Sequence, residues 1–446
     1  MEHFYGRIAV LLKSCCGMVE NRFTLSTSHR QVAPQLKEAT DCFMIRNFKP
    51  YRRLLRFFGC FFVQGLTEDA YPRARVTWWT SYTLYSLAWF SSMAYIESEY
   101  MAAAVYGIMT GELVQSVAAF LKISVVTNVF INIASMTLGT RRLLEFFRNC
   151  ARYEKSAKFR SPTARGSRRP RCHIRLIRTV GLTAVVTAYG TILAVYYGPR
   201  GTRAHWSAFS KAVGVASLAV SMFYEWIVYL TLSSTCEVLA LYARDQRAVF
   251  EESRREDATA SPGPVAETET TGPRPSPSWT VESVRVNLTR IRELKTSIND
   301  IWGVALVFSA VTTLLAKCSA LHQLINSGGH GVAGLLMSLQ AIHSATRFYE
   351  LAFISQSLRD EANDVKESAK AATMLEADDS YSKQVLFLQD SIDPDEMCLS
   401  GAAFFRLGKP LIISMMGAVI TYTVILTQTG QSLTQETNEN VTSTAP

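Results

Sequence analysis

The feature that most constrains this chain is its clustered apolar sequence, in which several windows of about 20 residues hold one ionisable group or none. A helical window of this length crosses the hydrocarbon core of a bilayer, so each window predicts a membrane span. Charged residues make up 19% of the chain, against roughly 25% in soluble domains. The sequence therefore predicts an all-α membrane protein with seven transmembrane helices, at 76–96, 113–138, 179–197, 212–234, 301–325, 332–355 and 411–428.

The orientation of these spans follows from the basic residues. With a cytoplasmic N-terminus, 39 of the 46 Lys and Arg residues lie in segments on the inner side, and three lie in outer segments. Inner loops of membrane proteins carry an excess of Lys and Arg. We therefore expect the N-terminus in the cytoplasm and the C-terminus outside the cell. The net charge of +9 then reflects topology, and we expect no nucleic-acid partner.

The segments between the spans define the expected organisation of the chain. An amphipathic stretch at 51–62 either lies in the lipid headgroups or packs on other helices. Helical periodicity at 280–300 predicts a helix that continues into the fifth span. In order, we expect a cytoplasmic N-terminal region (1–75), spans one to four (76–240) with a basic loop (141–178), a cytoplasmic loop (241–300) that is disordered at about 258–278, spans five and six (301–356), a cytoplasmic segment (357–407), span seven (408–430) and an extracellular tail (431–446).

Cysteine and histidine give no sign of a metal site. None of the nine cysteines has metal-ligand spacing, and the seven histidines are scattered along the chain. The sequence also has no nucleophile elbow and no phosphate-binding glycine loop. We predict no cofactor, no metal ion and no enzymatic activity.

Two ionisable residues in the spans lie at a depth at which they would meet. Glu225 in the fourth span and Arg347 in the sixth both fall roughly 20–22 Å below the outer boundary, at about 1.5 Å per residue. Charged groups in hydrocarbon pair with one another or mark a functional site. We favour a structural ion pair between Glu225 and Arg347 over a role in ligand binding.

A second polar layer lies nearer the outer boundary. Lys122, Lys317 and Gln340 fall roughly 12–14 Å below it, and His343 lies slightly deeper. No acidic residue shares this layer. Two interpretations stay open: the floor of a water-filled ligand pocket, or lysines that are deprotonated or extend along neighbouring helices. His343 is correspondingly a ligand contact or a packing histidine.

The seventh span ends in polar residues, among them Thr421, Tyr422 and Gln428. A span that ends in this way faces protein or water rather than lipid, and we interpret it as the wall of a pore. Val424 and Ile425 lie one turn before Gln428 and are apolar candidates for a dewetting gate. Tyr422 is either a pore residue or a packing residue whose hydroxyl bonds a neighbouring helix.

Three segments resemble one known family. Thr421 and Tyr422, followed after five residues by Gln428, resemble the C-terminal signature of insect and other arthropod gustatory receptors, which is T-Y, five residues, then Q-F. The approach at 400–407 and the helix at 292–303 are similar to the same family, part of the insect chemoreceptor superfamily. The sequence departs from the signature at one position, because Thr429 stands where the family has Phe.

The resemblance implies a ligand-gated, non-selective cation channel of sensory transduction in the plasma membrane, opened by a small-molecule tastant. It implies a tetramer of identical or related subunits whose seventh helices line a central pore. Cytoplasmic extensions of helices four to seven would form an anchor region between the subunits. Carried over by residue, Thr421, Tyr422 and Gln428 match the signature, whereas Thr429 leaves open what closes the pore. A sugar, a bitter compound, an amino acid and carbon dioxide all remain compatible as ligands.

Two other classes fit part of this pattern. A multi-span transporter also holds polar groups at mid-membrane, although this chain shows no internal repeat. A G-protein-coupled receptor has seven helices as well, but it keeps its N-terminus outside, opposite to the distribution of Lys and Arg here. Ligand-evoked current carried by several cations, without saturating uptake, would separate a channel from a transporter.

Overall fold

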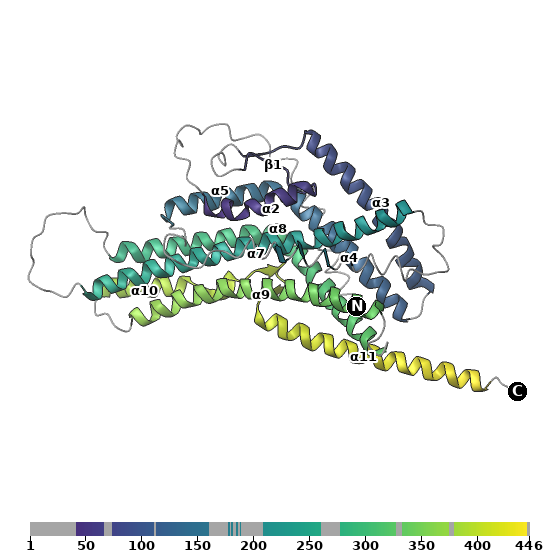
Figure 1. Ribbon diagram of the computed structural model, residues 1–446. Coiled ribbons are helices and arrows are strands. Elements are labelled where there is room, and N and C mark those ends of the chain that lie inside the picture. The colour runs from purple at the N-terminus through teal and green to yellow at the C-terminus, as the bar shows by residue number, and fades with distance from the viewer. Residues whose placement is uncertain are drawn as a thin grey trace, which may run out of the picture. The chain divides into compact units, whose positions relative to one another are not determined.

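The computed structural model describes residues 42–66, 74–110, 113–159, 208–259, 277–326, 332–373 and 379–443, with isolated residues between 177 and 188 (Figure 1). These residues form an all-α structure with two small hairpins. β1 (Val63–Gln64) pairs with β2 (Arg75–Val76), and β3 (Ser400–Gly401) pairs with β4 (Phe405–Arg406). The helices are α2 (Phe43–Phe57), α3 (Ser81–Thr110), α4 (Leu113–Leu138), α5 (Thr140–Ser156), α7 (Ala208–Thr259), α8 (Pro277–Asn326), α9 (Val332–Thr373), α10 (Asp379–Ser391), the 3-10 helix η3 (Pro394–Met397) and α11 (Lys409–Ser443).

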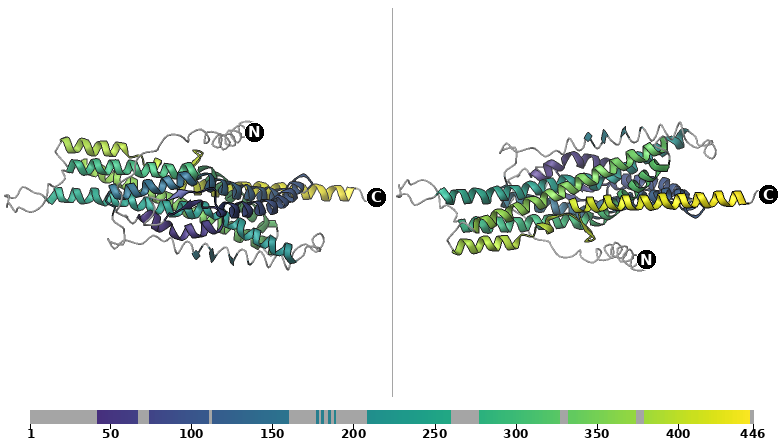
Figure 2. Two further views of the ribbon diagram at one scale, coloured as in Figure 1. Left: turned by 90° about the horizontal axis from the view of Figure 1, so that it is seen from above. Right: turned by 90° about the horizontal axis from the view of Figure 1, so that it is seen from below.

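The core lies between the three longest helices. α7, α8 and α9 pack against one another and run side by side, and α4 packs against α8 and α7 (Figures 1 and 2). The stripe that predicted the helix before the fifth span is buried along α8: Val281, Val284, Leu288, Ile291 and Ile298. This confirms the prediction of one helix continuous with the fifth span.

The described helices agree with several expected spans. α4 has the bounds predicted for the second span, and α9 begins at the residue predicted for the sixth. Three segments within the described residues are long and apolar enough to cross a membrane, Ala119–Leu138, Phe223–Arg255 and Trp279–His322, and Lys409–Ile425 is a shorter apolar helix. The third expected span, 179–197, lies outside the described residues apart from isolated positions.

Several helices extend past the predicted ends of the spans. α7 and α9 continue through their charged segments, where Arg244 pairs with Glu361 and Arg247 pairs with Asp364. Such pairs between neighbouring helices allow charged stretches to stay helical. α11 likewise continues to Ser443, so most of the expected tail at 431–446 is helix.

The helix at the position of the expected first span begins and ends later than predicted. Because β2 pairs with β1, the helix α3 starts at Ser81 rather than at 76. It then runs through Glu97, which is buried, to Thr110. No proline interrupts α3, so nothing in its sequence ends the helix at 96.

The amphipathic segment before the first span lies against other helices. α2 begins at Phe43 and ends at Phe57, because Gly59 adopts a positive φ of 75° and the chain then becomes extended. Its apolar face packs on α5 and α7. Of the two interpretations for this stretch, the structure shows helix packing. The segment predicted to be disordered, 258–278, lies outside the described residues except at its two ends.

A carboxylate of α5 caps the start of α2. Glu154 accepts hydrogen bonds from Phe43 N at 2.7 Å and Met44 N at 3.0 Å, and the Tyr242 hydroxyl donates to it as well. A carboxylate is a favourable partner for the unpaired N–H groups of a helix N-terminus. Burial raises the pKa of Glu154, against the lowering effect of these donors.

Candidate pore helix and ligand cavity

The helix α11 contacts the rest of the chain along one narrow stripe. Met415, Val419 and Thr423 follow one another at intervals of four residues, and all three are buried. They lie on one face of a helix with 3.6 residues per turn. This face packs against α8 and α9.

The opposite face of α11 is uncovered. Gly417, Thr421, Val424 and Gln428 recur at intervals of four, three and four residues, which places them on one face. A Cβ atom added at Gly417 would meet no atom within 4 Å, and Thr421 and Gln428 are exposed. Val424 is 48% exposed, and Ile425 beside it is 49% exposed.

Part of the polarity of α11 is satisfied inside the helix. Thr421 Oγ1 donates to Gly417 O at 3.0 Å, Thr423 Oγ1 to Val419 O at 2.7 Å, and Thr427 Oγ1 to Thr423 O at 2.9 Å. Such bonds to the carbonyl four residues earlier relieve each hydroxyl of its need for another partner. Tyr422, which is 55% exposed, lies on the flank between the two faces. The side chain of Thr429 lies outside those that the structure describes.

The hairpin before α11 is docked on α8 and α9. Asn299 Nδ2 donates to Ser400 Oγ at 2.7 Å, and Ser400 N donates to Asn299 Oδ1 at 3.1 Å. Leu399 N donates to Ser355 Oγ at 2.9 Å. The two segments that resembled the gustatory receptors, 292–303 and 400–407, are therefore in contact.

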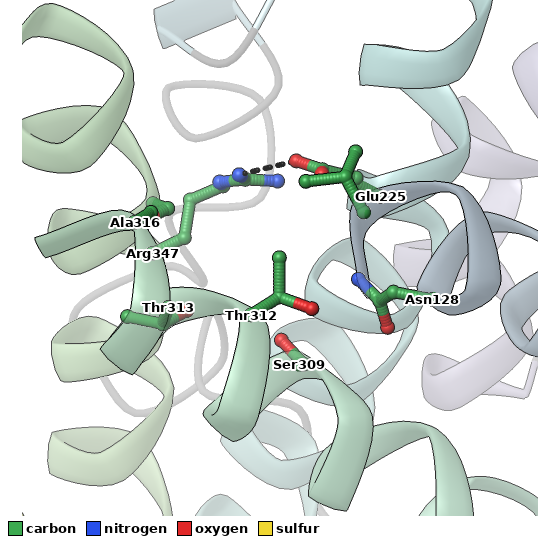
Figure 3. A pocket seen from close by; sticks show the side chains of 9 residues that line it. Asn128, Glu225, Ser309, Thr312, Thr313, Ala316 and Arg347 are labelled. Atoms are coloured by element: carbon green, nitrogen blue, oxygen red, sulfur yellow. Dashed lines mark hydrogen bonds and ion pairs between the residues drawn. The ribbon is translucent and has the colours of Figure 1, made fainter. Parts of the chain in front are cut away.

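A polar cavity lies within the helical bundle, between α4, α7, α8 and α9 (Figure 3). Arg347 Nη2 lies 3.0 Å from Glu225 Oε2, and the two side chains are only 12% and 8% exposed. The Arg347 guanidinium also lies 5.6 Å from the ring centroid of Trp226. The structure thus brings together the two residues that the depth calculation predicted to pair. The lining residues are Val125, Asn128, Glu225, Ser309, Thr312, Thr313, Ala316, Ser344 and Arg347.

The cavity is small and rich in hydrogen-bonding groups. Its volume is about 20 Å³, which is room for about one water molecule. Arg347 Nε and Asn128 Oδ1 are buried and have no hydrogen-bond partner among the described residues. Figure 3 shows the side chains of Asn128, Ser309 and Thr312 turned toward the ion pair. A molecule that entered here would meet both donors and acceptors.

Two of the residues predicted to form a ligand pocket near the outer boundary, Lys317 and His343, have other neighbours than the bundle cavity. The Lys317 ammonium bonds the Tyr349 hydroxyl and lies 3.9 Å from the centroid of that ring. His343 is buried, and its ring centroid lies 5.1 Å from that of Trp226. Neither residue lines the cavity. The side chains of Lys122 and Gln340 lie outside those that the structure describes.

Sequence reasoning missed several polar residues of the bundle. Asn128, Ser309 and Thr312 line the cavity, but uncharged residues of this kind are common in membrane helices. A second missed contact joins Arg178 to the Tyr229 hydroxyl at 3.0 Å and to Glu350. The spacing of three between Ser309 and Thr312, on a span that should be apolar, was the available signal.

Comparison with known proteins decides the family. The family model described as "7tm Chemosensory receptor" matches residues 48–433. The chain belongs to this family. Among solved structures, it is similar to the insect olfactory receptor OR5 from Machilis hrabei in complex with eugenol, with a TM-score of 0.65, 12% identity, and coverage of 87% of this chain and 100% of that one. A second structure of the same receptor has a TM-score of 0.59 and 13% identity, and the match again covers 87% of this chain and 100% of that one.

Sequence similarity to one curated relative is local. The chain is 24% identical over 135 residues to the odorant receptor coreceptor of Anopheles gambiae. The alignment spans 30% of this chain and 28% of that relative. These comparisons show a multi-pass, all-α membrane protein of a chemosensory receptor family, which is not a family of enzymes. The relatives named here are odorant receptors rather than gustatory receptors.

Proposed function

We propose that this chemosensory receptor is one subunit of a ligand-gated, non-selective cation channel of the gustatory type. The observation that carries the proposal is the uncovered face of α11. Among its described side chains beyond the first turn, α11 buries only Met415, Val419 and Thr423 against its own chain, which leaves the opposite face for other subunits and for water. In a tetramer of identical or related subunits in the plasma membrane, four such faces surround a pore.

The chemistry of this face suits a cation pathway. Thr421 and Gln428 offer hydroxyl and amide oxygens without a fixed charge, which suits weak and non-selective contact with cations. Val424 and Ile425 between them supply an apolar constriction that closes by dewetting. Thr429 replaces the aromatic residue of the signature, so closure rests on these two aliphatic side chains. Tyr422, on the flank, contacts a neighbouring subunit.

The proposed topology has seven spans with a cytoplasmic N-terminus. The distribution of Lys and Arg supports it, as does membership of a family described as seven-helix receptors. In this orientation the charged continuations of α7, α8 and α9 lie in the cytoplasm. They form the anchor region together with α10, whose Leu386 and Phe387 are exposed apolar residues.

The proposed ligand is a small-molecule tastant bound among the helices. The solved complex of OR5 with eugenol supports a small organic ligand for this fold, and the signature at Thr421 to Gln428 supports the gustatory branch. Lys122, Lys317, Gln340 and His343 remain the proposed pocket residues toward the extracellular side. The ion pair of Glu225 and Arg347 forms the floor below them.

Cysteine accessibility tests the proposal directly. The receptor is expressed in a cell line and exposed to sucrose, caffeine, glycine, carbon dioxide and eugenol while whole-cell current is recorded. We expect an agonist-evoked current carried by both Na⁺ and K⁺. A charged methanethiosulfonate reagent should change this current in Thr421→Cys, on the uncovered face, and leave it unchanged in Val419→Cys, on the packed face.

Two results would contradict the proposal. Saturable uptake of the ligand without current would indicate a transporter. Equal modification of Thr421→Cys and Val419→Cys would show that the uncovered face of α11 does not line the pathway.

A further inference from the structure

A second and larger cavity lies where the helix α8 meets the hairpin before α11. Its volume is about 650 Å³, which is within the usual range for a small-molecule site. It is formed by the segments 292–296 and 395–406, and it is separate from the bundle cavity. The lining residues are Arg292, Lys295, Thr296, Asp395, Glu396, Cys398, Ser400, Ala403, Phe404, Phe405 and Arg406.

The acidic groups of this cavity are already paired. Arg292 lies 2.7 Å from Glu396. Asp395 is shared between Arg359 at 2.8 Å and Arg406 at 3.1 Å. Both carboxylates therefore have arginine partners of their own, and neither lies within ion-pair distance of the further cation that lines the cavity.

Lys295 is that further cation. It lines the cavity and is only 7% exposed. Within the described part of the chain its ammonium makes no ion pair within 4.0 Å and no hydrogen bond. The Lys295 side chain is largely buried beside this cavity, and an anion in contact with the ammonium would compensate for the hydration lost there. The geometry thus calls for an anion inside the cavity.

Other groups around Lys295 are donors as well. Ser400 Oγ accepts a hydrogen bond from Asn299, which leaves its own proton free to be donated. Arg292 and Arg406 each have five N–H donors and use only part of them on carboxylates. Phosphate oxygens accept several charge-assisted hydrogen bonds at once, and a site composed of one lysine and two arginines is typical for them.

We propose that this cavity binds a phosphate-bearing anion, with Lys295 as its central contact and Arg292, Arg406 and Ser400 as further donors. Two sources supply this chemistry on the cytoplasmic side of the proposed topology: the headgroup of a phosphoinositide in the inner leaflet, or a soluble phosphate such as a nucleotide. The bound anion joins α8 to the hairpin that leads into α11 three residues later. It is a cytoplasmic ligand that acts at the base of the pore helix.

The experiment measures binding by the purified full-length protein, so its result does not depend on whether the protein conducts ions. In one arm, titrations use ATP and inositol 1,4,5-trisphosphate with the protein in phosphate-free nanodiscs of a glycolipid. In the other arm, binding to nanodiscs that contain fluorescent phosphatidylinositol 4,5-bisphosphate is compared with binding to nanodiscs that carry the same total charge as phosphatidylserine. We expect saturable binding in at least one arm, and the arm identifies the source.

Three variants locate the site. Lys295→Met keeps the length of the side chain, removes a buried charge, and should weaken binding at least about tenfold through loss of a charge-assisted hydrogen bond. Thr296→Glu places a carboxylate in the cavity and should weaken binding to a similar degree, even if Lys295→Met folds poorly. Lys370→Met, an exposed residue of α9 away from the cavity, is the matched control and should bind as the wild type does.

The outcomes are decisive in both directions. Loss of affinity in Lys295→Met and Thr296→Glu, with an unchanged Lys370→Met control, supports the proposal in either arm. Wild-type affinity in well-folded Lys295→Met, or no saturable binding in either arm, overturns it.

Discussion

Removing Arg347 from its ion pair should destabilise the bundle by an amount that the geometry constrains. The charged atoms lie 3.0 Å apart, and at an effective dielectric constant of about 20 their attraction is about 5.5 kcal/mol before the cost of burying the charges. Removal of one partner leaves Glu225 buried at 8% exposure without a counter-charge. Loss of one partner of a buried pair typically costs about 3–5 kcal/mol. We therefore expect Arg347→Met to lose about 3–5 kcal/mol, a large part of the stability of an ordinary domain.

Two double variants separate charge pairing from other causes. Glu225→Gln combined with Arg347→Met removes both charges and should be far more stable than Arg347→Met alone. The swapped pair, Glu225→Arg with Arg347→Glu, should recover most of the loss. The swapped pair should not restore the full stability, because the contact of the Arg347 guanidinium with Trp226 is lost. That contact contributes about 0.5–1 kcal/mol.

The differences in stability are measured in detergent as melting temperatures, with fluorescence-detected size-exclusion chromatography as the readout of unfolding. Glu282→Gln is the control, because it breaks the pair with Arg285 at 2.6 Å, in which Glu282 is 51% exposed. Exposed pairs contribute less than about 1 kcal/mol, so this variant should melt near the wild type. If Arg347→Met melts with the control, or if both double variants are no better than the single one, the pairing does not stabilise the bundle.

Two further predictions concern the packing of the hairpin and of α2. A Cβ atom on Gly303 would lie 3.1 Å from Ala402 N, so Gly303→Ala should not raise the melting temperature. A Cβ atom on Gly417 would meet no atom within 4 Å, so Gly417→Ala should stabilise the protein by up to about 1 kcal/mol through helix propensity. Equal gains in both variants would contradict the close approach of Gly303 to Ala402. Burial raises the pKa of Glu154 above 4.5, so the folded protein holds this proton more tightly than the unfolded chain does, and stability should fall as pH rises through this range. Glu154→Gln should flatten that fall in melting curves recorded between pH 4 and 8, and an unchanged profile would count against the capping carboxylate.

The start of several spans could be predicted from the sequence, and the end of most could not. The windows at Leu113 and Val332 begin where α4 and α9 begin, because a long apolar run has few other structures available. A hydropathy window ends where charge begins. In the structure the charged stretches stay helical, since Arg244 and Arg247 find acidic partners on α9, and contacts between distant residues are invisible to a local window.

Some contacts of the candidate site could be predicted from the sequence, and others could not. Depth along a helix is a one-dimensional quantity, and it brought Glu225 and Arg347 to the same level, where the structure places them 3.0 Å apart. Depth alone did not foresee the partner of Lys317, because a long flexible side chain reaches along the helix to the ring of Tyr349 at another level. Asn128 stayed hidden because a single amide in an apolar span carries no directional signal.

The hairpin before α11 links the bundle to the proposed pore helix. It is held from two sides, through Asn299 of α8 and through Ser355 of α9. Its tip has little freedom to absorb movement, because Ala402 lies against Gly303, and Ala402 and Ala403 already hold positive φ angles of 46° and 64°. Such angles cost an L-residue roughly 1–2 kcal/mol each, so they persist only while the surrounding contacts enforce them. A displacement of α8 against α9 therefore either breaks these hydrogen bonds or moves the first turn of α11 with the hairpin.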